Sequence, residues 1–351
     1  MTRSHAGAAD HAACRAAIRT GSRSFFAASA LLPASVRRPA YGLYAFCRLS
    51  DDAVDETAQQ NRAAAVARLS ERLSLAYSGR PRDAAADRAL ADIVAEFEIP
   101  QALPAALIEG LSWDAQGRRY ETLSDLTAYA ARVAASVGAM MTLIMGARDR
   151  LVLARACDLG LAMQLTNIAR DVGEDARAGR LYLPLAWLRE AGIDPDAFLA
   201  DPVLTPELQG LVARLLAVAD ALYERAEAGI AELPSGCRPA IRAARLIYAE
   251  IGRDLERAGH DSIGRRARVP GRRKAVLMAR ALFPLSEARI CAEPALPEVA
   301  FLVEAVRPPE EAPRTVPWWN FPGQVVRVLD LIEVLRERDA FAREGASPLS
   351  P

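Results

Sequence analysis

Two short segments of the sequence place acidic side chains directly behind apolar residues that suit a helix. The first is LYAFCRLSDDAVDE at 43–56, where Asp51 and Asp55 stand four positions apart. On a helix both would share one face with Arg48. Because the preceding residues are apolar, that face should point inward, where uncompensated carboxylates are costly. Magnesium, a hard cation that takes carboxylate and phosphate oxygens, suits such a cluster.

A second acidic segment, LAMQLTNIARDVGEDARAGRLYLP, spans 161–184. Asp171 and Asp175 repeat the spacing of four on an otherwise apolar helix. Either segment alone could be a capped helix end or a solvated charged face. Two of them, with arginines able to bind phosphate oxygens as forks, predict a magnesium–diphosphate site. The polar side chains that extend or flank this second stripe are Gln164, Asn167, Arg170 and Glu174.

Helices are the elements expected to position these residues. Ala, Leu, Arg and Glu dominate, and alternating β-branched runs are missing, so the fold class should be all-α. Pro and Gly clusters at 31–39, 98–104, 192–207 and 233–239 separate stretches of helical length. Composition changes near 284. We therefore expect a helical domain at 1–284 and an appendage at 285–351, made of a Pro-rich segment and an amphipathic helix at 324–344.

Composition excludes several classes of protein. The 44 basic residues balance the 44 acidic ones, so no overall field favours nucleic acid. Five scattered cysteines without a CxxC pair suggest reduced thiols, a cytoplasmic location and no zinc site. We expect no signal peptide, because the amino end lacks a continuous apolar region. The apolar run at 133–147 is too short to span a bilayer and predicts a buried helix.

The quoted segments resemble the squalene/phytoene synthase family of head-to-head prenyl synthases, and most closely its bacterial phytoene-forming members. GSRSFFAASALLP at 21–33 and RVAASVGAMM at 132–141 match further motifs of that family, and the resemblance runs from about residue 14 to 282. It implies a single-domain helical bundle around a central cavity. It also implies that two geranylgeranyl diphosphates condense through prephytoene diphosphate to phytoene with release of diphosphate, the first committed step of carotenoid biosynthesis.

The resemblance assigns roles to individual residues. Catalysis would fall to Asp51, Asp55, Asp171, Asp175 and Tyr129. Magnesium would be held by Asp51, Asp52, Asp55, Asp171, Glu174 and Asp175. Substrate contacts would come from Ser22, Arg23, Ser24, Tyr44, Arg48, Val133, Val137, Gly138, Gln164, Asn167, Arg170, Tyr248 and Arg266. Some relatives have His where Gly21 stands, so the contact made there by His has no counterpart in this sequence.

The same resemblance implies a Mg²⁺ requirement, with Mn²⁺ as a substitute, and no need for NADPH. The implied partners are geranylgeranyl diphosphate, the inner membrane surface as a peripheral contact, and other carotenoid-pathway enzymes, but no nucleic acid. Two alternatives stay open. One is a squalene, presqualene diphosphate or dehydrosqualene synthase that uses farnesyl diphosphate. The other is a non-catalytic lipid-binding or assembly relative, although such a protein should lose acidic positions that are all present here.

Overall fold

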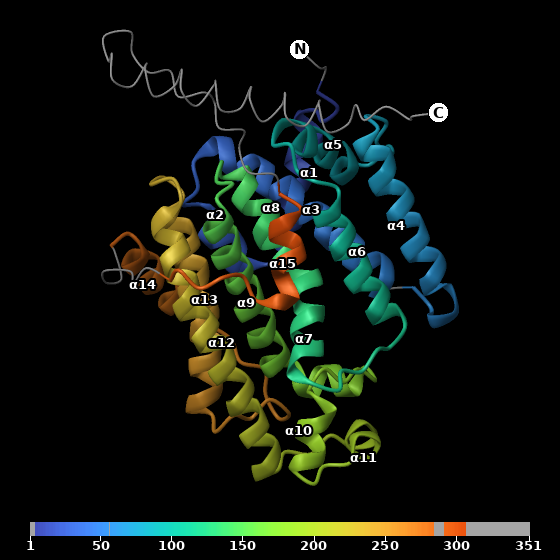
Figure 1. Ribbon diagram of the computed structural model, residues 1–351, viewed down its shortest axis with the longest axis vertical. Coiled ribbons are helices and arrows are strands. Elements are labelled where there is room, and N and C mark those ends of the chain that lie inside the picture. The colour runs from blue at the N-terminus through green and yellow to red at the C-terminus, as the bar shows by residue number, and fades with distance from the viewer. Residues whose placement is uncertain (1–3, 56, 284–290, 307–351) are drawn as a thin grey trace, which may run out of the picture. The chain divides into compact units, whose positions relative to one another are not determined.

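Helices make up most of the part of the chain that this computed structural model describes, which is residues 4–55, 57–283 and 291–306 (Figure 1). No strand occurs in those ranges, so the expected all-α class is confirmed. In chain order the elements are α1 (Ala8–Gly21), α2 (Arg23–Ser29), α3 (Ala34–Asp55), the 3₁₀ turn η1 (Gln59–Asn61), α4 (Arg62–Tyr77), α5 (Ala85–Glu96), α6 (Ala102–Ala115), α7 (Leu123–Ala130), the π-helical η2 (Ala131–Ala135), α8 (Ser136–Ile144), α9 (Arg150–Arg177), α10 (Leu185–Glu190), α11 (Pro195–Ala200), α12 (Pro206–Glu232), α13 (Arg238–Arg257), α14 (Gly271–Ala281) and α15 (Pro297–Glu304).

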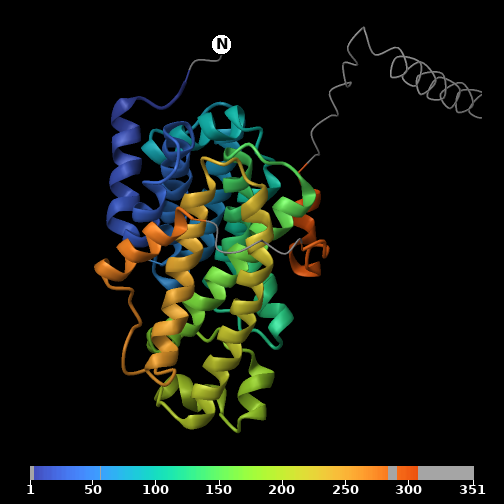
Figure 2. The same ribbon diagram turned by 90° about the vertical axis from the view of Figure 1, so that its left-hand side faces the viewer.

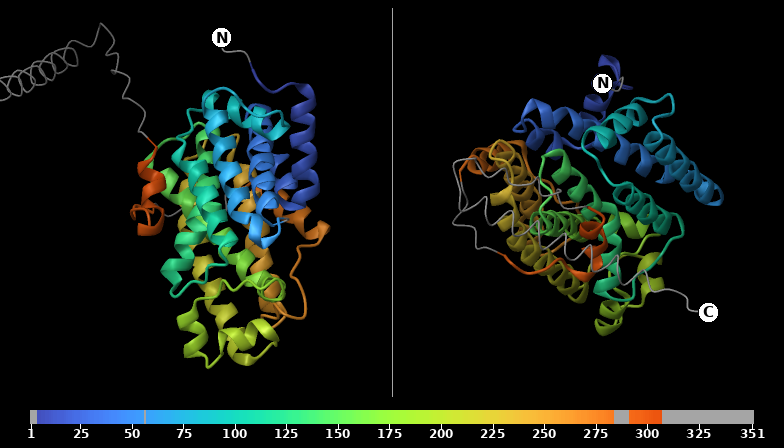
Figure 3. Two further views of the ribbon diagram at one scale, coloured as in Figure 1. Left: turned by 90° about the vertical axis from the view of Figure 1, so that its right-hand side faces the viewer. Right: turned by 45° about the horizontal axis from the view of Figure 1, so that its top comes forward.

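Helix α9 is the central element of the bundle. It contacts α12, α13, α8 and η2 along its length, and the views in Figures 1 and 3 show these neighbours around it. The helix begins at a defined residue because the Asp149 carboxylate accepts hydrogen bonds from the backbone N–H groups of Leu151 and Val152. It ends before Gly179, whose positive φ of 75° suits a glycine. A buried central helix can therefore present its polar stripe to the interior.

The helical run Leu123–Ile144 joins α7, η2 and α8 and packs against α9. It is long and apolar enough to cross a bilayer, but 61% of its apolar window is buried within the protein, as in a core helix. A glycine on α9 permits the close approach, because a Cβ on Gly160 would lie 2.7 Å from the Ala135 Cα. The π turn, which often marks a functional site, faces this contact.

Helix α15 extends the helical unit beyond the boundary that composition suggested at 284. Its apolar residues Val299, Leu302 and Val303 are buried against the neighbouring helices α7, α8 and α9. The preceding segment is also held, because Arg155 of α9 donates hydrogen bonds to the carbonyl oxygens of Cys291 and Pro294. The composition signal missed this because the buried face of α15 is only two turns long. The amphipathic helix predicted at 324–344 lies outside the described residues.

Candidate active site

The two acidic segments meet in space. The first carboxylate cluster (Asp51, Asp52 and Asp55) occupies the last turns of α3, and the second carboxylate cluster (Asp171, Glu174 and Asp175) occupies the last turns of α9. Arg180, in the turn after α9, donates a hydrogen bond of 2.5 Å from Nη2 to Asp55 Oδ1. This ion pair connects the ends of two helices that are distant in the sequence. The structure thus brings all six predicted metal-binding residues to one region.

Several of these carboxylates form ion pairs with arginine side chains. The Arg48 guanidinium forms a fork on Asp52, with N–O distances of 2.6 and 3.0 Å. Arg170 and Arg266 both bind Asp171, and their Nε atoms lie 2.7 and 2.9 Å from its Oδ1. Arg266 also contacts Glu174, with Nη1 and Oε2 at 3.1 Å. The predicted diphosphate contacts therefore stand beside the predicted metal ligands, as a magnesium–diphosphate site requires.

Two carboxylates in the clusters have raised pKa values. Burial raises the pKa of Asp51 to about 6, and the neighbouring Asp55 carboxylate raises it further. Burial likewise raises the pKa of Asp175 to about 7, with Asp171 adding to the effect. Both shifts mean that negative charge is disfavoured here in the absence of an added cation. A divalent ion would relieve that repulsion.

Magnesium fits the donor set. The acidic side chains of both clusters offer hard oxygen ligands, and burial together with neighbouring carboxylates raises the pKa of Asp51 and Asp175, which a bound cation would counteract. Among the described residues, no three acidic, His or Cys side chains are close enough to hold one ion by themselves. An ion would therefore take one or two carboxylates and fill its octahedron with water and phosphate oxygens, which is the usual habit of Mg²⁺.

A further acidic residue, Asp114 on α6, lies near both clusters. It is close enough to raise the pKa of both Asp51 and Asp175. Its carboxylate accepts hydrogen bonds from the hydroxyls of Tyr129 at 2.7 Å and Tyr182 at 2.8 Å. Tyr129, predicted to be catalytic, is therefore fully engaged with Asp114 and does not line the apolar cavity.

Sequence reasoning missed Asp114, Arg180 and Tyr182. Arg180 and Tyr182 lie inside a quoted motif, RAGRLYLP, but their roles depend on partners from α3 and α6. Asp114 had only a weak signal, as an acidic residue that follows the largely apolar segment ALIEGLSW at 106–113. No spacing rule connects it to either cluster.

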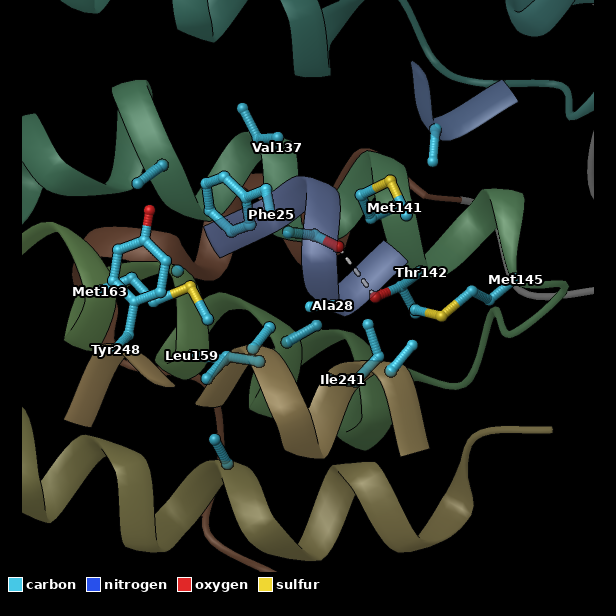
Figure 4. Close-up of a pocket in the computed structure, with 18 of the residues that line it drawn as sticks. Phe25, Ala28, Val137, Met141, Thr142, Met145, Leu159, Met163, Ile241 and Tyr248 are labelled. Carbon is cyan, nitrogen blue, oxygen red and sulfur yellow. Dashed lines mark hydrogen bonds between the residues drawn. The ribbon is translucent and has the colours of Figure 1, made fainter. Parts of the chain in front are cut away.

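An apolar cavity of about 330 Å³ opens beside the clusters and runs along α9. Figure 4 shows Tyr248 and Met163 toward one end, Phe25 and Leu159 in the middle, and Met141 and Met145 toward the other. The Phe25 and Tyr248 rings stack with centroids 5.0 Å apart. Seven of the predicted substrate contacts line this cavity, namely Tyr44, Val133, Val137, Gly138, Gln164, Asn167 and Tyr248.

One buried polar atom in this cavity has no partner. Asn167 Oδ1 is shielded from solvent and accepts no hydrogen bond among the described residues. Such an atom costs free energy unless a ligand or water satisfies it. Asn167 stands one turn before Asp171 on α9. The position fits the contact with metal-bound water or diphosphate expected from the sequence.

The turn between α1 and α2 explains Gly21. A Cβ at that position would collide with the Tyr44 hydroxyl. The Tyr44 hydroxyl thus occupies the space that a side chain at position 21 would need. Ser22 caps α2, with its Oγ accepting from the Phe25 N–H at 3.2 Å.

A basic pocket of about 430 Å³ adjoins the second carboxylate cluster. It contains the predicted contacts Arg23, Ser24, Arg170 and Arg266, and two cations that the sequence did not single out, Arg268 and Lys274. The amide contact between Gly173 N–H and the Ser262 carbonyl, at 3.0 Å, fixes the loop that carries Arg266 against α9. Five cations around one polar pocket suit a polyanion such as diphosphate.

Comparisons with known proteins agree with this geometry. The family model of squalene/phytoene synthase matches residues 18–273. The chain is 56% identical to a phytoene synthase of Rhodobacter capsulatus, covering 85% of this chain and 90% of that protein. It is 55% identical to a phytoene synthase of Cereibacter sphaeroides, covering 85% and 88%.

Solved structures of similar proteins share the fold. A dehydrosqualene synthase in complex with a ligand superposes with a TM-score of 0.71 and 30% identity, covering 78% of this chain and 95% of that one. A squalene synthase from Alicyclobacillus acidocaldarius gives a TM-score of 0.66 and 28% identity, covering 72% and 95%. The described helices therefore follow the arrangement of isoprenoid synthases.

Proposed function

The chain belongs to the squalene/phytoene synthase family, and on that premise we propose that it acts as a phytoene synthase. Members of the family transfer prenyl groups, and the substrate is a prenyl diphosphate. In the proposed reaction two molecules of geranylgeranyl diphosphate yield one phytoene, two diphosphates and two protons. Because no hydride enters this balance, NADPH is not needed.

One observation carries the proposal. The ion pair between Arg180 and Asp55 brings the two carboxylate clusters together, and the apolar cavity lies beside them. An allylic diphosphate has a polyanionic head and a hydrocarbon tail. The acidic and basic groups suit the head, and the cavity suits the tail. A site for two such substrates needs both features next to each other.

The proposed chemistry has two ionisations. In the first, the C1–O bond of one substrate breaks, and the double bond of the second attacks the allylic cation with loss of a proton, giving a cyclopropyl diphosphate. In the second, that diphosphate leaves, the carbon skeleton rearranges to the C1–C1′ bond, and proton loss gives the central double bond. Bound Mg²⁺ would stabilise the negative charge on the leaving diphosphate.

The protein's own residues have separate tasks in this scheme. Arg48, Arg170 and Arg266, which pair with Asp52 and Asp171 in the structure, would hold diphosphate oxygens when the substrate binds. The apolar walls exclude water, which would otherwise quench a carbocation. Two aromatic rings, Phe25 and Tyr248, present π faces that favour a nearby cation.

The residues that line the cavity from α9 extend from Val152 to Asn167, fifteen positions that correspond to about 22 Å of helix. This extent is compatible with an extended C20 tail and equally with the shorter C15 tail, so product analysis distinguishes the two. The expected cytoplasmic location, with contacts to the membrane and to other carotenoid-pathway enzymes, also belongs to the proposal.

Product analysis tests the proposal. Purified full-length protein with Mg²⁺ is incubated with labelled geranylgeranyl or farnesyl diphosphate, each with and without NADPH. We expect phytoene from the C20 substrate without NADPH. Squalene formed only with NADPH, or dehydrosqualene formed in preference to phytoene, would overturn the assignment in favour of a C15 enzyme. No product from either substrate would favour a non-catalytic relative.

A further inference from the structure

The basic pocket beside the second carboxylate cluster depends on a loop that has no regular structure of its own. Residues 265–270 form neither helix nor strand, and α14 begins directly after them. This loop and the first turn of α14 supply the pocket cations Arg266, Arg268 and Lys274. Figures 1 and 2 show α14 next to α13, and in Figure 2 the loop (orange) turns back beside α13 to reach α14. The contacts that hold these cations in place must therefore come from outside the loop.

Crowding of positive charge makes this arrangement costly. Arg23 and Arg170 face the same pocket from α2 and α9. Burial and the Arg23 guanidinium together lower the pKa of Lys274. Asp171 balances part of the charge by pairing with Arg170 and Arg266. The remaining repulsion favours movement of the loop away from the pocket unless the loop is anchored.

Two carboxylates on α13 supply such anchors. Glu250 is only 7% exposed and accepts a hydrogen bond from Arg273 Nη2 of α14 at 2.8 Å. Asp254 stands four positions later and so shares the same face of α13. It accepts hydrogen bonds from the Arg268 backbone N–H at 3.3 Å and from the Arg265 side chain. We call Glu250 and Asp254 the acidic brace.

The acidic brace binds the chain at residues that directly precede pocket cations. Arg265 binds the brace, and the next residue, Arg266, lines the pocket. Arg273 binds the brace, and the next residue, Lys274, lines the pocket. Each anchor therefore fixes the backbone beside a cation without pairing with that cation.

Glu250 carries its negative charge although it is buried. Burial opposes the charge, but hydrogen bonds from Arg273 and from Arg257, the latter at 3.0 Å, keep the pKa of Glu250 below its usual value. Glu250 lines neither the basic pocket nor the apolar cavity. It can therefore act on a bound substrate only through the loop and α14.

We propose that Glu250 and Asp254 are positioning residues for the basic pocket. By holding the loop and the first turn of α14, they let Arg266, Arg268 and Lys274 converge on one polyanion. Because the assignment of this pocket to diphosphate is part of the proposed function, this inference rests on that function. Loss of a brace charge then has two opposite effects. The change in charge alone would tighten anion binding, whereas displacement of the loop weakens it, and we expect displacement to dominate.

Binding of inorganic diphosphate to the full-length protein tests the proposal. Isothermal titration calorimetry at a fixed MgCl₂ concentration gives the dissociation constant. We expect Glu250→Gln and Asp254→Asn each to weaken binding about tenfold, because each removes a charge-assisted hydrogen bond to the loop or α14. Arg273→Gln, which changes a side chain outside the pocket, should weaken binding by a similar factor. The double variant Glu250→Gln/Arg273→Gln should bind about as well as either single variant, because both changes remove one shared ion pair.

Glu227→Gln is the matched control. It breaks a pair of similar exposure between α12 and α13, with Arg245 at 2.9 Å, and should bind diphosphate as the wild type does. Urea unfolding of every variant shows that binding is compared between folded proteins. Asp254→Asn and Arg273→Gln, at more exposed positions, keep the test decisive if Glu250→Gln does not fold.

Three results would overturn the proposal. The first is unchanged or tighter binding of diphosphate by the folded brace variants. The second is an additive loss in the double variant. The third is absence of binding in the wild type, which would also remove the assignment of the pocket to diphosphate. Product analysis tests the enzymatic proposal separately, since an enzyme that formed squalene would bind the same diphosphate.

Discussion

Arg180 and Asp55 form an ion pair of 2.5 Å although 125 positions separate them in the chain. The pair joins the end of α3 to the turn that follows α9, and each of those helices carries one carboxylate cluster. The proposed site therefore depends on a contact that neither motif contains by itself. Loss of the Arg180–Asp55 pair should therefore lower the catalytic rate more than it lowers the free energy of unfolding.

Replacing Arg180 tests that view. Arg180→Gln should lower kcat/KM by about 10- to 100-fold, because a charge-assisted hydrogen bond is worth about 1.5–3 kcal/mol. The free energy of unfolding should change by less than about 1 kcal/mol, since both partners are partly exposed. Steady-state kinetics and urea unfolding measure the two effects. Arg119→Gln, which breaks an exposed pair with Asp196, is the control and should change neither. A fully active Arg180→Gln enzyme would show that the pair has no role in turnover.

Asp114 is expected to act through Tyr129. Asp114→Asn and Tyr129→Phe should each reduce kcat, and the double variant should lose less than the sum of the two by about 0.5–3 kcal/mol, because both remove one shared hydrogen bond. Kinetics of the four proteins in the cycle give this coupling. The control Tyr77→Phe removes a hydroxyl that donates to the Ile99 carbonyl far from the clusters, and should leave kcat unchanged. Additive effects would mean that Asp114 does not position Tyr129.

Close packing between α9 and η2 predicts a contrast between two glycines. A Cβ on Gly160 would lie 2.7 Å from the Ala135 Cα and 2.8 Å from the Ala134 carbonyl oxygen, and backbone cannot give way easily. Gly160→Ala should therefore destabilise the protein by about 1–3 kcal/mol. Gly210→Ala, in α12 with no atom within 4 Å, should instead stabilise it by about 0.5–1 kcal/mol. Thermal unfolding of both variants measures these changes in stability. Equal changes in the two variants would contradict the tight contact at Gly160.

The raised pKa values of Asp51 and Asp175, about 6 and about 7, predict the pH dependence of magnesium binding. In metal-free protein these groups keep their protons above the pH at which the unfolded chain loses them. Stability from this source is therefore fully present below about pH 4, the unfolded-state value, and is lost progressively as pH rises to the folded-state values of about 6 and 7. Magnesium competes with those protons, so its stabilising effect should grow over the same range.

Thermal shifts with and without MgCl₂ and inorganic diphosphate at pH 5.5, 6.5 and 8.0 measure this linkage. We expect the largest increase in melting temperature at pH 8.0. CaCl₂ at equal concentration is a control for general ionic effects and should give a smaller shift, because Ca²⁺ prefers more ligands than this site offers. A shift independent of pH would argue against these carboxylates as the metal ligands.

Local patterns in the sequence predicted much of the fold and of the site. The all-α class followed from composition and periodicity, and both carboxylate clusters followed from spacings of four on apolar helices. Asp114 could not be predicted in the same way, because an isolated acidic residue has no periodic pattern. Its role depends on hydrogen bonds from Tyr129 and Tyr182, which only the folded structure shows. The boundary at 284 missed α15 for a similar reason, since its few buried residues gain their partners only from α7, α8 and α9.

The most direct test of the central claim is the rate of diphosphate release from geranylgeranyl diphosphate with Mg²⁺. The account predicts that Asp55→Asn and Asp175→Asn, one from each cluster, each lower this rate by at least about 10²-fold, because charge at the reacting centre is then no longer balanced. Asp196→Asn, in an exposed pair with Arg119, should match the wild type. If either cluster variant kept more than about a tenth of the wild-type rate while the product remained phytoene, the two-cluster site would be contradicted.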